Sequence, residues 1–236
     1  ISLGLVGSEM CIRDRGFSAM VTGLKIALAN GDVLWCDHDR NPRLFEAARL
    51  GLGALGIITE VRIRTVELYR LQRKEYSTDT DTAVESFLDE GDKHDHRELF
   101  WSPQAKRAVV RELNHVPADT PRKMPSKPRR LVQSELVGNG AFALANSVVR
   151  KVPKLRGPAS AGVSTLMPSS EAVGAPYEIF TEPRRVKFRE SEMAIPADRF
   201  VEAFSALRSV LENLNSHLIF PLEIRRAKAD DVWISG

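Results

Sequence analysis

Two residues near the end of the sequence, Glu223 and Arg225, have the types and the spacing needed for chemistry on a small polar molecule. They are two apart in a stretch with strand-like alternation, so both side chains should project from one face, with Leu222 and Ile224 on the other. A fixed guanidinium can stabilise developing negative charge, and a carboxylate beside it can orient substrate hydroxyl groups. Taken alone, the pair fits an exposed salt bridge better, because that is the common role of such a pair.

A second stretch that could meet a ligand is GLGALGIITEV, residues 51–61, in which three glycines lead into a strand. Glycine has no Cβ, so it can turn with positive φ and lets another backbone or a ligand approach closely. The residues Ile57, Ile58 and Thr59 have the β-branched composition of a buried strand. The pattern predicts either a helix C-cap followed by a strand or a loop whose backbone binds a ligand.

The elements upstream should hold this glycine loop in place. Residues 42–49 predict a short helix with proline in its first turn. Asn30-Gly31 between the apolar runs 24–29 and 33–36 predicts a hairpin with a tight turn, in which both central residues need positive φ. The expected order is therefore hairpin, helix, glycine loop and strand.

From Tyr69 onward the pattern predicts a second domain, an antiparallel sheet with helices. The expected strands are 71–76, 97–101, 107–113, 186–195 and 218–224, and the expected helices are 78–92, 131–149 and 197–213. The segments 117–130 and 157–176 should be surface loops because they are rich in proline, glycine or basic residues. The apolar stripe of the last helix should face the core, and it comprises Phe200, Val201, Phe204, Leu207 and Leu211.

The run from Gly16 to Val66 resembles the end of the FAD-binding domain of sugar-lactone and alditol oxidases, a branch of the vanillyl-alcohol-oxidase superfamily. Blocks 96–103, 186–196 and 220–235 are similar to the same enzymes, in the same order. The resemblance implies an α+β fold. Residues 16–68 would be the C-terminal part of a PCMH-type FAD-binding domain, and residues 69–236 a cap or substrate domain with an antiparallel sheet and helices, truncated at its C-terminus.

The resemblance also implies a cofactor, a reaction and the residues involved. The cofactor is FAD, bound through the backbone and packing of Gly53, Gly56, Ile57, Ile58 and Thr59. The reaction oxidises a hydroxyl carbon of a sugar lactone, of the D-arabinono-1,4- or L-gulono-1,4-lactone type, or of an alditol, with hydride transfer to flavin N5 and electrons passed to oxygen or another acceptor. Glu223 and Arg225 take the catalytic and substrate-binding roles. The alternative is a catalytically silent or flavin-free binding domain on the same fold.

Parts of the resembled enzymes have no counterpart in the sequence. In those enzymes the phosphate-binding loops precede this region, together with a histidine that is bonded to the flavin in many members. A histidine and a lysine close to the flavin follow this region. We therefore expect an internal fragment that is inactive alone. Residues 1–15, ISLGLVGSEMCIRDR, resemble a translated sequencing-adapter remnant and are excluded from fold reasoning, together with Cys11.

Composition narrows the class of protein. With 43% hydrophobic and 28% charged residues, the chain is typical of a globular protein rather than a disordered one. No apolar run approaches the roughly 18 residues of a membrane span, and two cysteines are too few for a disulfide framework. We expect a cytoplasmic location, with peripheral membrane association left open but not indicated. The net charge of +3 is mild, so no nucleic-acid partner is expected.

Three histidines, His94, His96 and His115, could in principle supply imidazole ligands to a metal. No carboxylate or histidine cluster at helical spacing supports that interpretation, and histidines in polar loops are usually solvated. The sequence therefore predicts no metal site.

Overall fold

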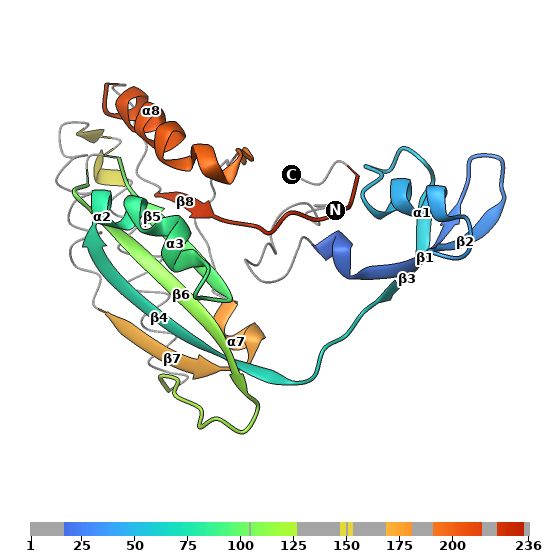
Figure 1. Ribbon diagram of the computed structural model, residues 1–236, viewed down its shortest axis with the longest axis horizontal. Helices are drawn as coiled ribbons and strands as arrows, with labels where there is room; N and C mark the ends of the chain where they lie inside the picture. Colours follow the sequence, from blue (N-terminus) through green and yellow to red (C-terminus); the bar gives the residue numbers. More distant parts are fainter. Residues whose placement is uncertain are drawn as a thin grey trace. The chain divides into compact units, whose positions relative to one another are not determined.

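The computed structural model describes residues 17–103, 105–126, 147–149, 151–152, 169–180, 191–213 and 221–233. The chain divides into two compact units (Figure 1), and the break lies between Glu67 and Leu68. The segment 227–233, which the sequence assigned to the second domain, groups with the first unit. Both units combine helices with antiparallel sheets, as predicted. Among the described residues, no helix has the length and apolar character of a membrane span.

The first unit is a three-stranded antiparallel sheet in the order β2-β1-β3, with a helix packed on it. Its elements are a 3-10 turn Phe17–Met20, β1 Val21–Ala27, β2 Val33–Asp37, α1 Pro42–Arg49 and β3 Ile57–Ile63. Leu24 and Ile26 of β1 and Cys36 of β2 form a core with Phe45 and Ala48 of α1. The helix begins at proline because the first helical residues need no backbone N–H donor.

The hairpin between β1 and β2 has a wider loop than the sequence predicted. Ala27 pairs with Val33, and the amide of Leu28 donates to the carbonyl of Asp32 at 2.8 Å. Within this loop only Gly31 has positive φ, at 90°. The hairpin is confirmed, but the prediction of a tight turn with positive φ at both Asn30 and Gly31 is wrong. The side chain of Asn30 instead accepts a hydrogen bond from the amide of Asp32 at 3.1 Å, which closes the loop locally.

The second unit is built on a five-stranded antiparallel sheet in the order β7-β4-β6-β5-β8. Its strands are β4 Tyr69–Asp79, β5 His96–Trp101, β6 Arg107–Pro117, β7 Ser170–Gly174 and β8 Leu222–Arg225. Its helices are α2 Thr80–Glu85, α3 Phe87–Gly91, α7 Pro176–Phe180, a 3-10 turn Ala197–Arg199 and α8 Phe200–Asn213.

Helices α2, α3 and α8 cover one face of this sheet (Figure 1). Trp101 of β5 is fully buried there, with its ring centroid 5.0 Å from that of Phe204 in α8. Helix α7 packs on the opposite face, where Ile179 joins Leu71 and Leu113 in a separate cluster. The charged residues of the candidate site lie on this second face.

Several predicted elements of the second unit differ from the structure. Helix 78–92 is two helices broken at Ser86, and Asp79 caps the first by accepting from the amides of Asp81 and Thr82. The predicted loop 157–176 contains β7, and its remainder up to residue 168 lies outside the described residues. Residues 191–196 form no strand although one was predicted there. Most of the predicted helix 131–149 also lies outside the described residues.

The apolar stripe of the last helix is only partly buried. Phe200, Phe204 and Leu211 of α8 lie in the core, whereas Val201 and Leu207 are exposed. The stripe predicted from periodicity is therefore wider than the face that the sheet covers.

Candidate active site

Glu223 and Arg225 both lie on β8, one of the two edge strands of the described five-stranded sheet. Their neighbours Leu222 and Ile224 pack against the helix-covered core. Alternation along the strand therefore sends the two charged side chains to the other face, as predicted. The geometric part of the prediction is confirmed, and the chemical role stays a prediction.

The two side chains form a loose pair that solvent can reach. The Nε atom of Arg225 lies 3.6 Å from Oε1 of Glu223, and Nη2 donates to Oε1 of Glu192 at 3.3 Å. The Arg225 side chain is 22% exposed and that of Glu223 is 33% exposed. Because a guanidinium has five N–H donors, Arg225 retains capacity to bind an anionic or carbonyl group of a ligand.

Strand pairing connects this pair to charged residues on three other strands. Arg225 lies opposite Glu98 of β5, and Glu98 lies opposite Arg111 of β6. Arg111 in turn lies opposite Glu75 of β4. We call these four residues, Glu75, Arg111, Glu98 and Arg225, the charge row. They alternate in sign across four adjacent strands, an arrangement in which each cross-strand neighbour attracts the next.

The inner members of the charge row are held by close contacts. Arg111 donates through Nη2 to Oε1 of Glu75 at 3.0 Å and through Nη1 to Oε2 of Glu98 at 3.2 Å. Its guanidinium carbon also lies 4.9 Å from the ring centroid of Phe100, a cation–π distance. Burial is the largest influence on Glu98 and raises its pKa. Among the nearby charges, Arg111 and Arg225 lower this pKa, whereas Glu223 raises it further. The carboxylate of Glu98 is therefore electrostatically linked to both predicted site residues.

Two of the three glycines in the loop, Gly53 and Gly56, differ in what surrounds them. Gly56 has φ of 150°, and a Cβ there would lie 2.3 Å from the carbonyl oxygen of Ala27 in β1. Close packing on β1 therefore requires Gly56, without reference to a ligand. Gly53 has φ of 74°, and no heavy atom lies within 4 Å of the position that its Cβ would occupy. Of the two, only Gly53 has the open surroundings expected of a ligand-facing turn.

Strand β3, which follows the loop, is exposed along its whole length, so the prediction of a buried strand is wrong. Ile57 is 73% and Ile58 is 45% exposed. Thr59 lies at a register shift, and its hydroxyl donates to the carbonyl of Lys25 at 3.4 Å. Since β3 is the edge of the described three-stranded sheet, its outward backbone groups have no strand partner there. This edge combines exposed apolar side chains with backbone N–H and C=O groups that can form hydrogen bonds to a ligand.

The predicted site residues thus fall into two groups. Gly53, Gly56, Ile57, Ile58 and Thr59 are together on the loop and edge strand of the first unit, and Glu223 and Arg225 are together on the second unit. Sequence reasoning missed Glu98 and Arg111, because their relevance comes from cross-strand register, which no local pattern encodes. The charges in these two strands, HRELFW and RAVVRELNHVP, do not recur at every second residue, so no local signal marks the two side chains.

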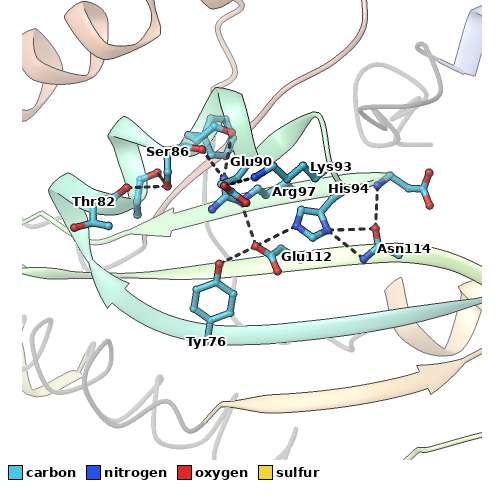
Figure 2. A network of polar contacts seen from close by, with 12 residues as sticks. Tyr76, Thr82, Ser86, Glu90, Lys93, His94, Arg97, Glu112 and Asn114 are labelled. Carbon is cyan, nitrogen blue, oxygen red and sulfur yellow. Dashed lines mark hydrogen bonds and ion pairs between the residues drawn. The ribbon is translucent and has the colours of Figure 1, made fainter.

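A separate polar network lies on the helix-covered face of the same sheet (Figure 2). Tyr76 donates to Oε1 of Glu112 at 2.7 Å, and Nε2 of His94 and Nε of Arg97 lie 3.4 and 3.5 Å from the same oxygen. Arg97 also donates to the carbonyl of Ser86 at 2.8 Å, which ties the start of α3 to the sheet. Burial raises the pKa of Tyr76, and the hydrogen bond to Glu112 raises it further. This network fastens α3 to the sheet.

The three histidines do not form one cluster. His94 belongs to the network just described, whereas the rings of His96 and His115 lie 6.0 Å apart on the opposite face. His96 also contacts the ring of Phe180 in α7 at 5.3 Å. Among the described residues, no group of three potential ligands is arranged to hold a metal ion.

Comparison with known proteins identifies the family. A family model described as D-arabinono-1,4-lactone oxidase matches residues 61–236. An L-gulono-1,4-lactone dehydrogenase of Mycobacterium tuberculosis is 29% identical over 224 residues, covering 95% of this chain and 51% of the relative. An L-gulonolactone oxidase of Bos taurus is 25% identical over 239 residues, covering 98% and 53%.

The chain therefore spans about half the length of the curated relatives it matches. Among solved structures, a cholesterol oxidase from B. sterolicum aligns with a TM-score of 0.49 and 16% identity, covering 68% of this chain and 33% of that one. The family model covers well over half of the chain. The chain belongs to the D-arabinono-1,4-lactone oxidase family.

Proposed function

We propose that the full-length protein containing this chain is an FAD-dependent oxidoreductase that oxidises a hydroxyl carbon of a sugar lactone of the D-arabinono-1,4- or L-gulono-1,4-lactone type. The observation that carries the proposal is the Glu223 and Arg225 pair, which is partly exposed on one sheet face of a chain in this family. Lactones are favoured over alditols because the family and the relatives are named for lactones. Those names include both oxidases and dehydrogenases, so the electron acceptor is oxygen or another oxidant.

The two residues have complementary tasks in this reaction. Oxidation removes a hydride from the carbon and a proton from its hydroxyl group, and bound FAD would accept the hydride at N5. Arg225 offers a fixed positive charge to negative charge that develops during transfer. Glu223 accepts hydrogen bonds from substrate hydroxyl groups and so orients the carbon that is oxidised.

The first unit supports cofactor binding through the glycine loop and β3. Gly53 lies in open space and in a left-handed conformation, so its backbone can approach a ligand. The outward backbone groups of Ile57, Ile58 and Thr59 can donate and accept hydrogen bonds, and the exposed isoleucine side chains offer apolar surface to a flat ring. These features fit FAD, and Gly56 contributes by holding the loop against β1.

The proposal is tested by spectroscopy on the purified full-length protein. We expect a flavin absorbance band that bleaches without oxygen on addition of L-gulono-1,4-lactone or D-arabinono-1,4-lactone, and that bleaches at least about tenfold more slowly with an alditol, which lacks the lactone carbonyl. A protein that cannot be loaded with FAD would refute the proposal and leave a flavin-free binding domain. A flavin that no lactone reduces would refute the substrate class.

A further inference from the structure

The charge row contains two carboxylates, Glu75 and Glu98, and the proposed function assigns a role to neither. Glu98 is the one on the strand next to β8. In the antiparallel register of β5 and β8 it lies opposite Arg225, and Phe100, two residues further along β5, lies opposite Glu223. Directly opposed residues in a sheet have Cβ atoms about 4.5 to 5.5 Å apart. Glu98 is therefore the cross-strand neighbour of Arg225, although the guanidinium itself contacts Glu192 at 3.3 Å and Glu223 at 3.6 Å and forms no ion pair with Glu98.

Glu98 is fixed from its other side. Arg111 donates to its Oε2 atom at 3.2 Å, and Arg111 is itself held by Glu75 and by the ring of Phe100. The Glu98 side chain is 14% exposed, so solvent and salt screen its charge less than they screen a surface carboxylate. Glu98 is therefore a negative charge at a defined place on the sheet.

We propose that Glu98 is a positioning residue for the substrate site, and that its negative charge, anchored by Arg111, attracts the guanidinium of Arg225 across the two strands, without a direct ion pair, and so favours its working position. The identity of that site rests on the proposed function. The two carboxylates that Arg225 contacts directly are poorly suited to this task. Glu223 must turn towards substrate, and Glu192 lies in a segment without regular structure, with its side chain 52% exposed.

Protonation of Glu98 should release Arg225. The charged groups facing Glu98 are Arg111 from β6 and Glu223 and Arg225 from β8. Burial raises the pKa of Glu98 above its ordinary value of 4.5. As the pH falls through this raised pKa, the carboxylate gains a proton and loses the charge that holds Arg225. Turnover should therefore decline on the acidic side at a higher pH than an ordinary glutamate would cause.

The test compares Glu98→Gln with Glu75→Gln in the FAD-loaded full-length protein. Both variants remove a carboxylate that pairs with Arg111, but Glu75 lies on β4, with β6 and β5 between it and β8. We expect Glu98→Gln to lower kcat by about tenfold to a hundredfold, with KM changed by less than about threefold, because a misplaced group costs transition-state stabilisation. It should also abolish the acidic decline in kcat. Glu75→Gln should change kcat by less than about twofold, which is small compared with the loss expected for Glu98→Gln.

An equal loss of kcat in both variants would show that the effect passes through Arg111, and it would overturn the proposal. An unchanged kcat and acidic decline in Glu98→Gln would overturn it as well. If Glu98→Gln does not fold, Glu98→Asp takes its place, because it keeps the charge but withdraws the carboxylate by one methylene. The same fall in kcat is then expected with the acidic decline retained, and an unchanged kcat would overturn the proposal.

A second measurement separates this proposal from the proposed function. The side-chain Nε–Hε signal of Arg225 in NMR spectra, assigned by its loss in Arg225→Lys, reports the surroundings of the guanidinium without any turnover. We expect this signal to move in Glu98→Gln and to stay in place in Glu75→Gln. A protein that oxidises no lactone but shows this difference would refute the function and retain the positioning role. A signal that does not move in Glu98→Gln would refute the positioning role whatever the activity.

Discussion

The Nε atom of Arg225 lies 3.6 Å from Oε1 of Glu223, on a strand whose other face is packed into the core. Arg226, the next residue, has a different environment, because it donates to the carbonyl of Leu88 and to Asp92 at the end of α3. The two adjacent arginines therefore have different partners. We propose that Arg225 binds a ligand, whereas Arg226 holds the end of α3.

This contrast gives a matched pair of variants for the proposed reaction. Arg225→Ala should slow reduction of bound FAD by a lactone by about a hundredfold to a thousandfold, the usual cost of losing one donor that stabilises developing charge. Arg226→Ala should leave the reduction rate within about threefold, since it lies outside the site, although it should lower stability. Rapid-mixing absorbance measurements without oxygen give both rates. Equal rates in the two variants would remove Arg225 from the mechanism.

The network around Glu112 should contribute to stability and not to the reaction. Glu112→Leu leaves Arg97, whose side chain is 3% exposed, without its carboxylate, and a broken buried ion pair costs about 3 to 5 kcal/mol. Tyr76→Phe removes one neutral donor to the same oxygen and should cost about 0.5 to 1.5 kcal/mol. Urea unfolding of the full-length protein measures both. A smaller loss in Glu112→Leu than in Tyr76→Phe would contradict this account.

The two glycines of the loop should respond differently to alanine. Gly56→Ala forces a Cβ against the carbonyl of Ala27, so we expect a loss of about 2 to 3 kcal/mol of stability. Gly53→Ala meets no atom and carries only the left-handed backbone penalty, about 1 kcal/mol. Thermal unfolding measures these losses. Weakened FAD binding by Gly53→Ala, at preserved stability, would support a ligand at Gly53, and unchanged binding would argue against one.

Asp37 should make the stability of the first unit depend on acidic pH. Hydrogen bonds from the indole of Trp35 and the amide of Arg40 are the largest causes that lower the pKa of Asp37 below its ordinary 3.8. A lowered folded-state pKa gives stability that is present above the unfolded pKa and is lost as the pH falls through the folded one. Asp37→Asn should therefore lower the unfolding temperature at pH 7 and differ less from the natural protein as the pH falls below 3.8. A difference that stays constant with pH would count against this assignment.

Much of the first unit could be predicted from local sequence. Helix Pro42–Arg49 has its predicted bounds because proline, the apolar spacing and the following glycines all act within a few residues. The exposure of β3 could not be predicted. A run of β-branched residues indicates a preference for strand structure, but it does not indicate whether another element covers that strand. Likewise the sequence indicated that the backbone at Gly56 packs closely against another group. It did not indicate that this group is the backbone of Ala27, nearly thirty residues earlier.

In the second unit, prediction failed where pairing partners are distant in sequence. Strand Ser170–Gly174 has weak strand preference and forms because β4 offers it an edge. Residues 191–196 end a segment that was predicted as a strand, but they have no paired strand in the described structure. The same limit applies to the site. Glu223 and Arg225 could be found from their spacing, whereas Glu98 needed the register of β5 and β8.

The first unit is discontinuous in the chain, because residues 227–233 return to it after the whole of the second unit. Val232 is buried there, and Asp231 lies 3.8 Å from the buried guanidinium of Arg49. During synthesis, α1 therefore leaves the ribosome long before the residues that complete its surroundings. Closing so long a loop slows folding, and the first unit should remain sensitive to proteases until the second has been made.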